Sequence, residues 1–442
     1  LTPPADLLDA WKQDDYVVLA HNGGLFDRIV LHHDPILPRI PASRWLDTQV
    51  QARSHGLPSS LANLCAAFRL PEDQAKLKDG RQLVLTFCAP VRGARILPQD
   101  KPEAWARFCE YAMRDVDSMR AVHNLMPAWN YPGPKFFSQG ERSLEYQYWL
   151  YDQAINDRGI ALDRVFCEAA VQTAKDERKA LAVRAQAVTD GAVQSATQRD
   201  AVLEHMLNAF GVTLPDLASD TIKRRLDDPD LPAEVRELLA VRLMAGKNAS
   251  SKYATALRAA SEDGRVRGMF AFCGATTTGR DSGQVVQVQN YPRPRPQTTE
   301  ADIEQGIADV IAGSADLLYD DTASLLGDCA RGMLVAAPGK KLIAADLSAI
   351  EARMLPWLAG ETKVLDFFRD YDAGLLKYDQ YMMEYANAFN VNPESVTKFQ
   401  RSLGKVLTLS LGYGGGAAAF VTFAATYHLD LEDIAAAVES TA

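Results

Sequence analysis

Two carboxylates follow an apolar run in the last quarter of the chain. Residues 342–345 have the pattern of a buried strand, Asp346 follows them directly, and Glu351 comes five residues later in an amphipathic helical pattern. A carboxylate fixed where a strand ends, with Ser348 as a candidate helix N-cap, is a suitable ligand for a hard cation such as Mg²⁺. The alternative is an ordinary strand-to-helix turn with Glu351 on the surface, and these residues alone leave both interpretations open.

A second group of residues recurs every four positions. Arg401, Lys405, Leu409 and Tyr413 have this spacing, which places side chains along one face of a helix. Two aligned cations suit a triphosphate, because arginine can donate to two oxygens at once and lysine supplies a point charge. A solvated basic helix with the tyrosine in the core is the alternative. It fits poorly with the uncharged residues between and after the cations.

Length and composition bound the class of protein. The 442 residues correspond to about two to four domains, and the hydrophobic and charged fractions of 47% and 24% are ordinary for a globular protein. Six dispersed cysteines without a CxxC pair indicate a reduced cytoplasmic protein. The uncharged stretch 406–427 is long enough for a membrane span, but its glycines, serines and threonines favour a buried or substrate-facing element.

The charge of the chain is unevenly distributed. The net charge of −10 argues against indiscriminate nucleic-acid binding. Between residues 242 and 295, however, there are nine Lys or Arg against three acids. Such an excess in an acidic protein is typical of one polyanion-binding face, and a solvated charge run is the equal alternative.

Hydrophobic periodicity divides the chain into α/β and helical regions. The first 130 residues alternate short apolar runs, YVVLAHN and QLVLTFCAP, with helical patterns at 61–70 and 102–125. NYPGPKFF at 130–137 is a linker marked by Pro and Gly. The rest follows in this order: almost wholly helical at 138–260, strands and loops at 264–295, helical at 301–328, strand-like at 333–346 and mostly helical from 347.

Three motifs, spread in order over most of residues 240–442, resemble those of family A (DNA polymerase I-like) DNA polymerases of the bacteriophage type. DLSAIEAR resembles the first polymerase motif, D-x-S-x-I-E-x-R. RSLGKVLTLSLGYG resembles the fingers-helix motif, R-x3-K-x7-YG, and TTTGRDSGQVVQVQNYP resembles the T-G-R…Q-N-x-P segment. The resemblance implies template-directed addition of deoxynucleotides to a primer 3′ end in phage-type DNA replication.

The resemblance also implies roles for individual residues. Asp346 would bind the catalytic metals, Glu351 would close the pocket against a ribose 2′-hydroxyl, and Tyr413 would support the template side of the insertion site. Leu409 stands where the family usually has Phe or Tyr, which bears on sugar discrimination. The other implied contacts are Arg401 and Lys405 to the triphosphate, and Arg280, Gln289, Asn290, Arg353 and the thumb residue Lys252 to primer-template or substrate.

The first 130 residues resemble the proofreading 3′–5′ exonuclease domain of the same family. AHNGGLFD, which ends in Asp27, resembles the N-x(3–5)-F/Y-D motif, and YAMRDVD resembles the Y-x3-D motif. Its Tyr111 and Asp115 are one helical turn apart, so the hydroxyl and the carboxylate can meet at one metal-bound water. Asp27 would supply another metal ligand. Each short motif alone has coincidence as its alternative, and their order before a polymerase favours the exonuclease.

The expected architecture is multidomain α/β. It places a ribonuclease H-like exonuclease domain at 1–130, followed by a right-hand polymerase with linker and thumb at 131–260, partial palm at 261–360 and partial fingers at 361–442. The expected ligands are Mg²⁺ in two-metal sites, with Mn²⁺ as a substitute, together with dNTPs and primer-template DNA. Replication accessory proteins are further expected partners, no membrane is expected, and the expected location is the bacterial host cytoplasm.

The sequence is expected to be a segment of a longer chain. Leu1 is not a natural start, and the last residues have the pattern of an interrupted helix. The D-x-E motif of the exonuclease would precede the segment and the His-Asp-Glu motif of the polymerase would follow it. Two-metal chemistry needs carboxylates from both polymerase motifs. A DNA-binding module without catalysis, or a nuclease with a helical appendage, are the alternatives, and the retained Asp346, Arg401 and Lys405 argue against both.

Overall fold

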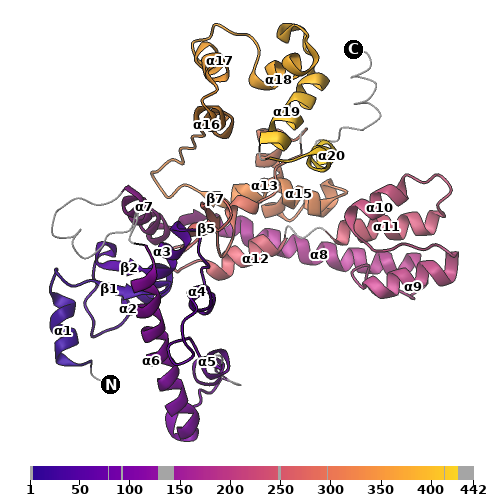
Figure 1. Cartoon of the computed structure of the whole chain (residues 1–442). Helices are drawn as coiled ribbons and strands as arrows, with labels where there is room; N and C mark the ends of the chain where they lie inside the picture. The colour runs from indigo at the N-terminus through magenta and orange to yellow at the C-terminus, as the bar shows by residue number, and fades with distance from the viewer. Residues whose placement is uncertain are drawn as a thin grey trace. The chain divides into compact units, whose positions relative to one another are not determined.

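A computed structural model describes residues 3–77, 79–90, 93–127, 144–246, 250–295, 297–412 and 414–426. The chain divides into two compact units, Leu1–Leu342 and Ile343–Ala442, which are described separately. Figure 1 labels their helices and strands. The linker expected at 130–137 lies outside the described residues.

The first unit begins with a small parallel sheet. β1 (Val18–Ala20) pairs with β2 (Trp45–Asp47) so that Val18 lies opposite Trp45. Around it are α1 (Ala5–Lys12), η1 (Gly23–Asp27), α2 (Arg28–Leu31), η2 (Ala42–Arg44) and α3 (Thr48–Ser54). Trp11, Trp45 and Trp149 form an apolar core with neighbouring aliphatic side chains, and this core holds the sheet against the next helical segment.

Two expected helices of the N-terminal region are confirmed and one expected strand is wrong. α4 (Leu61–Ala67) and α6 (Pro102–Leu125) lie within the predicted spans, and η3 (Pro98–Asp100) precedes α6. QLVLTFC, predicted as an apolar run of the strand type, lies in the helix α5 (Gly80–Cys88). Its Leu83 and Phe87 are four residues apart and buried, and the Phe87 ring centroid lies 5.2 Å from that of Trp105 on α6. Packing against α6 therefore outweighs the strand propensity of this segment.

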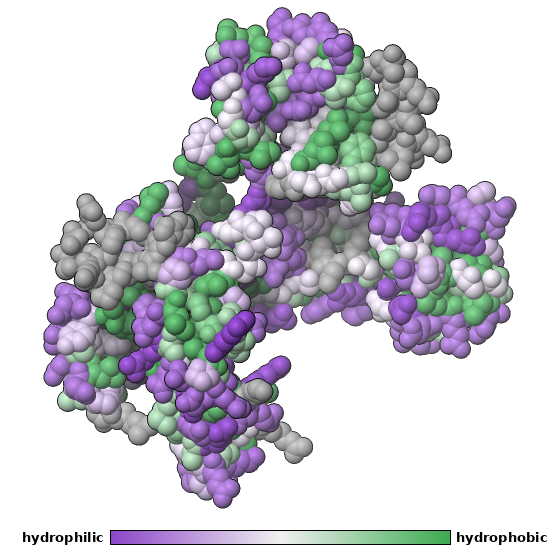
Figure 2. Space-filling model, in the orientation of Figure 1, coloured by the Kyte–Doolittle hydropathy of each residue, from purple (hydrophilic) through white to green (hydrophobic). Residues whose placement is uncertain are grey.

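The region from 144 to 260 is helical as predicted, apart from the short strand β3 (Ile160–Leu162). Its helices are α7 (Leu144–Arg158), α8 (Arg164–Val188), α9 (Arg199–Phe210), α10 (Ser219–Leu226), α11 (Ala233–Ala245) and α12 (Ser250–Ala259). The Asp163 side chain caps α8 by accepting from the Phe166 N–H. One end of α8 carries the lobe formed by α9–α11 (Figure 1), which has its own apolar core. The visible face of this lobe is mostly hydrophilic (Figure 2).

The strands and helices expected at 264–295 and 301–328 are confirmed. β5 (Phe270–Ala275) and β6 (Arg280–Gly283) form an antiparallel hairpin, and β4 (Arg265–Val266), β3 and β7 (Leu334–Val335) form a second sheet in that order. The remaining elements are η4 (Val288–Asn290), α13 (Glu300–Ala312), α14 (Ala315–Leu318), α15 (Thr322–Asp328) and η5 (Ala330–Met333). Residues of α8, α12, α13 and α15 share one apolar core.

The second unit is helical, as predicted for residues after 347. It contains α16 (Ile350–Ala359), α17 (Thr362–Asp372), α18 (Gln380–Phe389), η6 (Pro393–Ser395), α19 (Lys398–Gly412) and α20 (Ala417–Thr426). α18 and α19 lie side by side (Figure 1), and a Cβ built on Gly404 of α19 would lie 1.9 Å from the Tyr381 carbonyl oxygen. The two helix backbones therefore touch at this point. None of the described helices is both long and apolar enough to cross a membrane.

Candidate functional site

The strand expected before Asp346 does not form. β7 ends at Val335, and residues 342–345 have no ladder partner in the described chain. Leu342 and Ile343 are 59% and 93% exposed, so the apolar run is not buried as the sequence predicted. A strand requires a neighbour to accept its main-chain hydrogen bonds, and none is present here. Asp346 and Glu351 are both exposed side chains on either side of a turn.

Arg353 holds the turn between these carboxylates. Its Nε donates to the Ser348 carbonyl oxygen at 3.0 Å, and its two Nη atoms donate to the Asp372 carboxylate at 2.7 and 2.8 Å. The guanidinium also lies 4.3 Å from the Phe368 ring centroid. The N-cap of α16 is Ala349, with a φ of 51°, so the capping role expected of Ser348 is wrong. Arg353 is engaged by α17 and the turn, and its expected contact with substrate stays a prediction.

Arg401 and Lys405 are brought together on one face of α19. Arg401 and Lys405 lie 5.3 and 5.9 Å from the centroid of the Tyr381 ring on α18. The Arg401 Nε donates to Asp379 Oδ2 at 2.7 Å, and Asp379 also caps α18 by accepting from the Met382 N–H. Asp379, which was not predicted as a site residue, thus fixes the orientation of Arg401. The only feature of the sequence that pointed to Asp379 is its position directly before a helical pattern.

The remaining positions of the predicted stripe differ in their surroundings. Leu409 is half-buried on α19, and Tyr413 lies outside the described residues. The four-residue spacing therefore gives a common face for Arg401, Lys405 and Leu409, as the helical period requires.

The candidate primer-template residues follow one another from α12 to the β5–β6 hairpin. The Lys252 ammonium lies 5.7 Å from the ring centroid of Tyr291. Tyr291 directly follows Asn290, the last residue of η4. A Cβ built on Gly283 would lie 2.3 Å from Gln289 Oε1, so Gln289 packs on β6. Arg280 begins β6 and is exposed. The structure thus brings Lys252, Gln289, Asn290 and Arg280 into one continuous part of the first unit.

Part of the basic stretch is neutralised by internal ion pairs. Arg267 donates to both oxygens of Asp263 at 2.9 and 2.6 Å. Arg295 donates to Asp328 at 2.7 Å, and this aspartate is 5% exposed. Lys247 lies outside the described residues. The number of Lys and Arg residues between 242 and 295 therefore overstates the positive charge that this stretch presents at the surface.

Asp27 lies at the end of η1, close to a second carboxylate. Burial, and next the charge of Asp47, raise the pKa of Asp27. Asp47 is 3% exposed and accepts hydrogen bonds from the N–H groups of Asn22, Gly24 and Gln49 at 2.9–3.0 Å. Three N–H donors thus fix the position of the Asp47 carboxylate. Asp47 was not predicted from the sequence, although it ends a strand as an aspartate followed by a helix.

Tyr111 and Asp115 meet on α6, as their spacing predicts, and Lys76 joins them. The Lys76 Nζ donates to Asp115 Oδ2 at 2.8 Å and lies 5.1 Å from the Tyr111 ring centroid. Burial raises the pKa of Tyr111. A Cβ built on Gly80 would lie 2.0 Å from the Tyr111 ring, so only glycine permits this approach. The segment KLKDG (76–80) therefore supplies a cation, Lys76, and with Gly80 the space for the Tyr111 ring.

His21 lies within the electrostatic range of Asp47 and Lys76. Burial lowers the pKa of His21, the charge of Asp47 raises it, and the charge of Lys76 lowers it. The His21 ring is hydrogen-bonded to the Thr48 hydroxyl and the Ser59 carbonyl. Within the described part of the chain, no three His, Cys, Asp or Glu side chains are placed together as metal ligands. Asp27 and Asp115 thus do not complete a metal site with a third such residue.

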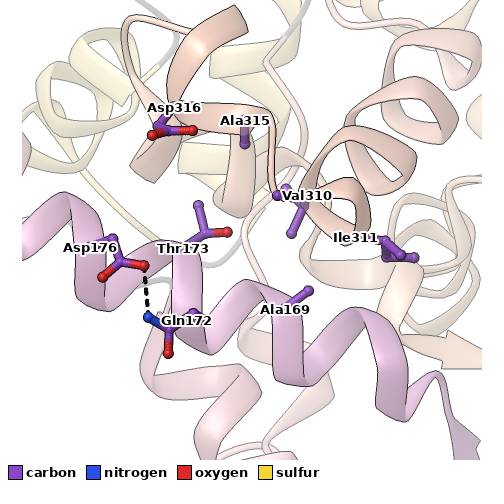
Figure 3. Close-up of a pocket in the computed structure, with 9 residues that line it drawn as sticks. Ala169, Gln172, Thr173, Asp176, Val310, Ile311, Ala315 and Asp316 are labelled. Carbon is purple, nitrogen blue, oxygen red and sulfur yellow. Dashed lines mark hydrogen bonds between the residues drawn. The ribbon is translucent and has the colours of Figure 1, made fainter.

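A cleft of about 260 Å³ lies between α8 and the α13–α14 connection (Figure 3). Its polar lining includes Gln172, which donates to Asp176 at 2.7 Å, and Asp316. Its apolar lining includes Val310 and Ile311. Carboxylates repel phosphate groups, and none of the predicted site residues lines this cleft. It is therefore not a candidate for nucleotide binding.

Comparison with known proteins finds related sequences and structures. The chain is 31% identical over 436 residues to a DNA polymerase of Bacillus phage SP02, covering 96% of this chain and 63% of the relative. The chain therefore spans less than two thirds of that relative's length. A solved structure of the POL domain of Pol1 from M. smegmatis, in complex with DNA primer-template and dNTP, has a TM-score of 0.48 and 18% identity, covering 94% of this chain and 64% of that one.

The family model described as DNA polymerase family A matches residues 167–427, which is more than half of the chain. The matched range contains all three motifs that carried the resemblance, including Asp346, Arg401 and Lys405. The chain belongs to DNA polymerase family A.

Proposed function

We propose that the protein is a template-directed DNA polymerase that adds deoxynucleotides to a primer 3′ end. Family membership and the likeness to a phage DNA polymerase support this proposal. The observation that carries it is the common face of Arg401 and Lys405 beside Tyr381. Two cations at one helical repeat offset part of the charge of a triphosphate, and Asp379 fixes the orientation of the arginine.

The chemistry proposed for α19 is binding and orientation. Arg401 presents a planar guanidinium that can bridge two phosphate oxygens, while Lys405 adds a point charge one turn later. When a triphosphate arrives, its oxygens compete with Asp379 for the guanidinium. Holding the nucleotide in this way lowers the entropic cost of aligning it with a primer end.

Asp346 is proposed as a Mg²⁺ ligand. Mg²⁺ takes oxygen ligands and is commonly held by one or two carboxylates together with substrate phosphates. The exposed Asp346 carboxylate has the right donor type, although the described residues do not assemble three metal ligands. The metal would polarise the phosphates and stabilise charge that develops during transfer. Glu351, in the first turn of α16, is proposed to limit space at the sugar 2′ position.

The primer-template is proposed to lie along the face that runs from α12 to the hairpin. Lys252 and Arg280 supply cations there, and Gln289 and Asn290 supply amide donors and acceptors. Amides and cations in this combination suit the phosphates and base edges of a duplex. Arg353 and Tyr413 are retained as proposed contacts of the nucleotide or template.

The N-terminal region is proposed as the 3′–5′ proofreading exonuclease. The arrangement of Tyr111, Asp115 and Lys76 supports this proposal, because a half-buried carboxylate, a phenol and an ammonium meet at one point. Asp27 is the proposed second carboxylate. The domain boundaries at 130, 260 and 360, with thumb, palm and fingers in that order, complete the proposal.

The test of polymerase function is nucleotide use by Arg401→Ala and Lys405→Ala in the complete enzyme. Each lost charge-assisted contact is worth about 1.5–3 kcal/mol, so kcat/KM for dNTP should fall about tenfold to hundredfold. Binding of primer-template should be unchanged. Lys363→Ala, which removes an exposed cation on α17, is the matched control. Unchanged KM and kcat in both site variants would contradict the proposed nucleotide site.

A further inference from the structure

The base of the β5–β6 hairpin is held by a single buried amide on α7. Asn156 is 3% exposed, its Oδ1 accepts from the Phe270 N–H at 2.9 Å, and its Nδ2 donates to the Phe270 carbonyl oxygen at 3.0 Å. Both main-chain groups of one strand residue are thus taken by one side chain. Two bonds to one residue fix the strand's rotation as well as its position, which a single hydrogen bond does not.

Two neighbours fix the orientation of this amide. Asn156 Nδ2 also donates to Asp152 Oδ2 at 3.1 Å, and Gln153 Nε2 donates to the same oxygen at 3.0 Å. Asp152 and Gln153 are 5% and 1% exposed. Because an acceptor lies beside it, the nitrogen of the Asn156 amide must point towards Asp152, and its oxygen is left to face the Phe270 N–H.

α7 is itself fixed to the N-terminal domain. Arg28, 2% exposed, donates to both oxygens of Asp157 at 2.8 and 2.7 Å and to Gln153 Oε1 at 3.2 Å. Its Nε donates to the Gly24 carbonyl oxygen at 3.3 Å. A Cβ on Gly24 would lie 2.8 Å from Gln153 Oε1, so this contact requires glycine. The helix that carries Asn156 is therefore a fixed support.

The hairpin transmits this placement to Arg280. Phe270 lies opposite Gly283, and Ala275 lies opposite Arg280 at the other end of the ladder. Cys273 donates its N–H to Asp281 Oδ1 at 2.9 Å, which ties the strands beside Arg280. On β6 the three steps from Gly283 to Arg280 span about 10 Å, and β5 has a bulge between Ala271 and Ala275 on the opposite side of the ladder. Gly279, with a φ of 69°, allows the turn that precedes Arg280.

We propose that Asn156 is a positioning residue for primer-template binding: by clamping Phe270 it sets the direction in which the hairpin presents Arg280 to DNA. The inference rests on the proposed function, in which Arg280 contacts the primer-template. Asn156 itself touches no DNA in this proposal. Its substitution is expected to act through Arg280 alone.

The experiment measures primer-template affinity of the chain against salt concentration, by fluorescence anisotropy. Each cation that leaves a duplex interface lowers the log–log slope by about 0.9. Arg280→Ala should lower the slope by about that amount and weaken binding about tenfold. Asn156→Ala removes no charge, yet the proposal predicts a similar loss of slope and about threefold to tenfold weaker binding. Tyr151→Ala, a 63% exposed position on the same helix, should change neither.

The double variant separates the proposal from simple loss of stability. If Asn156 acts through Arg280, Asn156→Ala together with Arg280→Ala should bind no more weakly than Arg280→Ala alone. An unchanged slope for Asn156→Ala, or additive losses in the double variant, would overturn the positioning role. If Arg280→Ala itself binds like the wild type, the proposed DNA contact has failed instead.

Two further measurements remain decisive if Asn156→Ala does not fold. Asn156→Ser is neutral and retains a hydroxyl for one of the two Phe270 groups, so it should show an intermediate loss of slope. Hydrogen exchange of the wild type needs no variant: the Phe270 N–H should be among the slowest in the hairpin, both free and with DNA bound. Fast exchange at Phe270 would show that the clamp does not hold the strand.

Discussion

The Lys76 ammonium donates a hydrogen bond to the Asp115 carboxylate, with 2.8 Å between Nζ and Oδ2. Each side chain of this pair is 27% exposed. The positive charge beside Asp115 thus comes from a segment 39 residues earlier in the chain. The ammonium neutralises the Asp115 carboxylate, so a metal ion that binds this carboxylate has to replace Lys76.

Asp115→Ala or Asp27→Ala should abolish removal of a mismatched primer end while leaving primer extension intact. A metal-binding carboxylate supplies several kcal/mol to a transition state, so 3′-end removal should fall at least about hundredfold. Asp117→Ala, whose exposed side chain on the same helix pairs only loosely with Arg120 at 3.8 Å, is the control. Digestion at the wild-type rate by both site variants would show that the exonuclease motifs are misassigned.

Asp346→Ala and Glu351→Ala should fail in different ways in the complete enzyme. Loss of Asp346, the proposed metal ligand, should stop polymerisation even at saturating nucleotide, because a metal held there would act on the chemical step. Glu351→Ala should open space at the 2′ position, so ribonucleotide incorporation should rise relative to deoxyribonucleotide. Single-turnover incorporation of both nucleotide types measures each effect. Normal polymerisation by Asp346→Ala, or unchanged sugar selectivity in Glu351→Ala, would remove the corresponding role.

Primer-template binding should weaken with salt, and the cations of the basic stretch should contribute unequally. Lys252→Ala should lower the log–log slope by about 0.9, since its ammonium is proposed to lie on duplex DNA. Arg267→Ala should leave the slope unchanged, because Asp263 already neutralises that guanidinium through two hydrogen bonds. Equal effects of the two substitutions would mean that ion pairing does not decide which cations reach the DNA.

Asp152 should make stability depend on pH in the acidic range. Burial, and next the charge of Asp281, raise the pKa of Asp152 to about 7, whereas a free aspartate has a pKa of about 3.9. The folded state therefore holds this proton more tightly than the unfolded chain. The stabilisation is complete below about pH 4 and is lost as the pH rises to about 7.

Asp152→Asn cannot ionise, so its stability relative to the wild type should increase between about pH 4 and 7 and stay constant above that range. The expected gain is on the order of 4 kcal/mol. Urea unfolding followed by the fluorescence of the buried Trp45 and Trp149 measures it. Asp200→Asn, at a 95% exposed side chain, is the control. Parallel pH profiles for wild type and Asp152→Asn would contradict the raised pKa.

Long helices with regular periodicity could be predicted from the sequence. The span 102–125 coincides with α6, because its apolar positions repeat at helical spacing and Pro102 starts it. QLVLTFC could not be assigned by the same means. Its residue types suit a strand, whereas the packing of Phe87 against α6, edge-on to Trp105 and stacked on Phe108, favours a helix.

The candidate site was predictable where its residues share one element. Arg401 and Lys405 lie on one helix, so their spacing alone places them together. Lys76 with Asp115, and Asn156 with Phe270, are separated by 39 and 114 residues. Such pairs depend on the packing of whole helices and strands, which local patterns do not contain. The apolar residues 342–345 before Asp346 were predicted to form a strand, but they are exposed and form none. Apolar residues form a strand only where another strand pairs with them, and the local pattern does not contain that partner.

The contact of Gly404 with the Tyr381 carbonyl brings the backbones of α18 and α19 together, and the side chains of Tyr385, Leu403 and Val406 pack in one core beside it. The two helices therefore cannot slide past each other without separating. Any swing of α19 towards a nucleotide must carry Asp379 and Tyr381 with it, as one block. Arg401 and Lys405 would then reach the phosphates already side by side, and only the hydrogen bond between Arg401 and Asp379 would have to give way to the nucleotide.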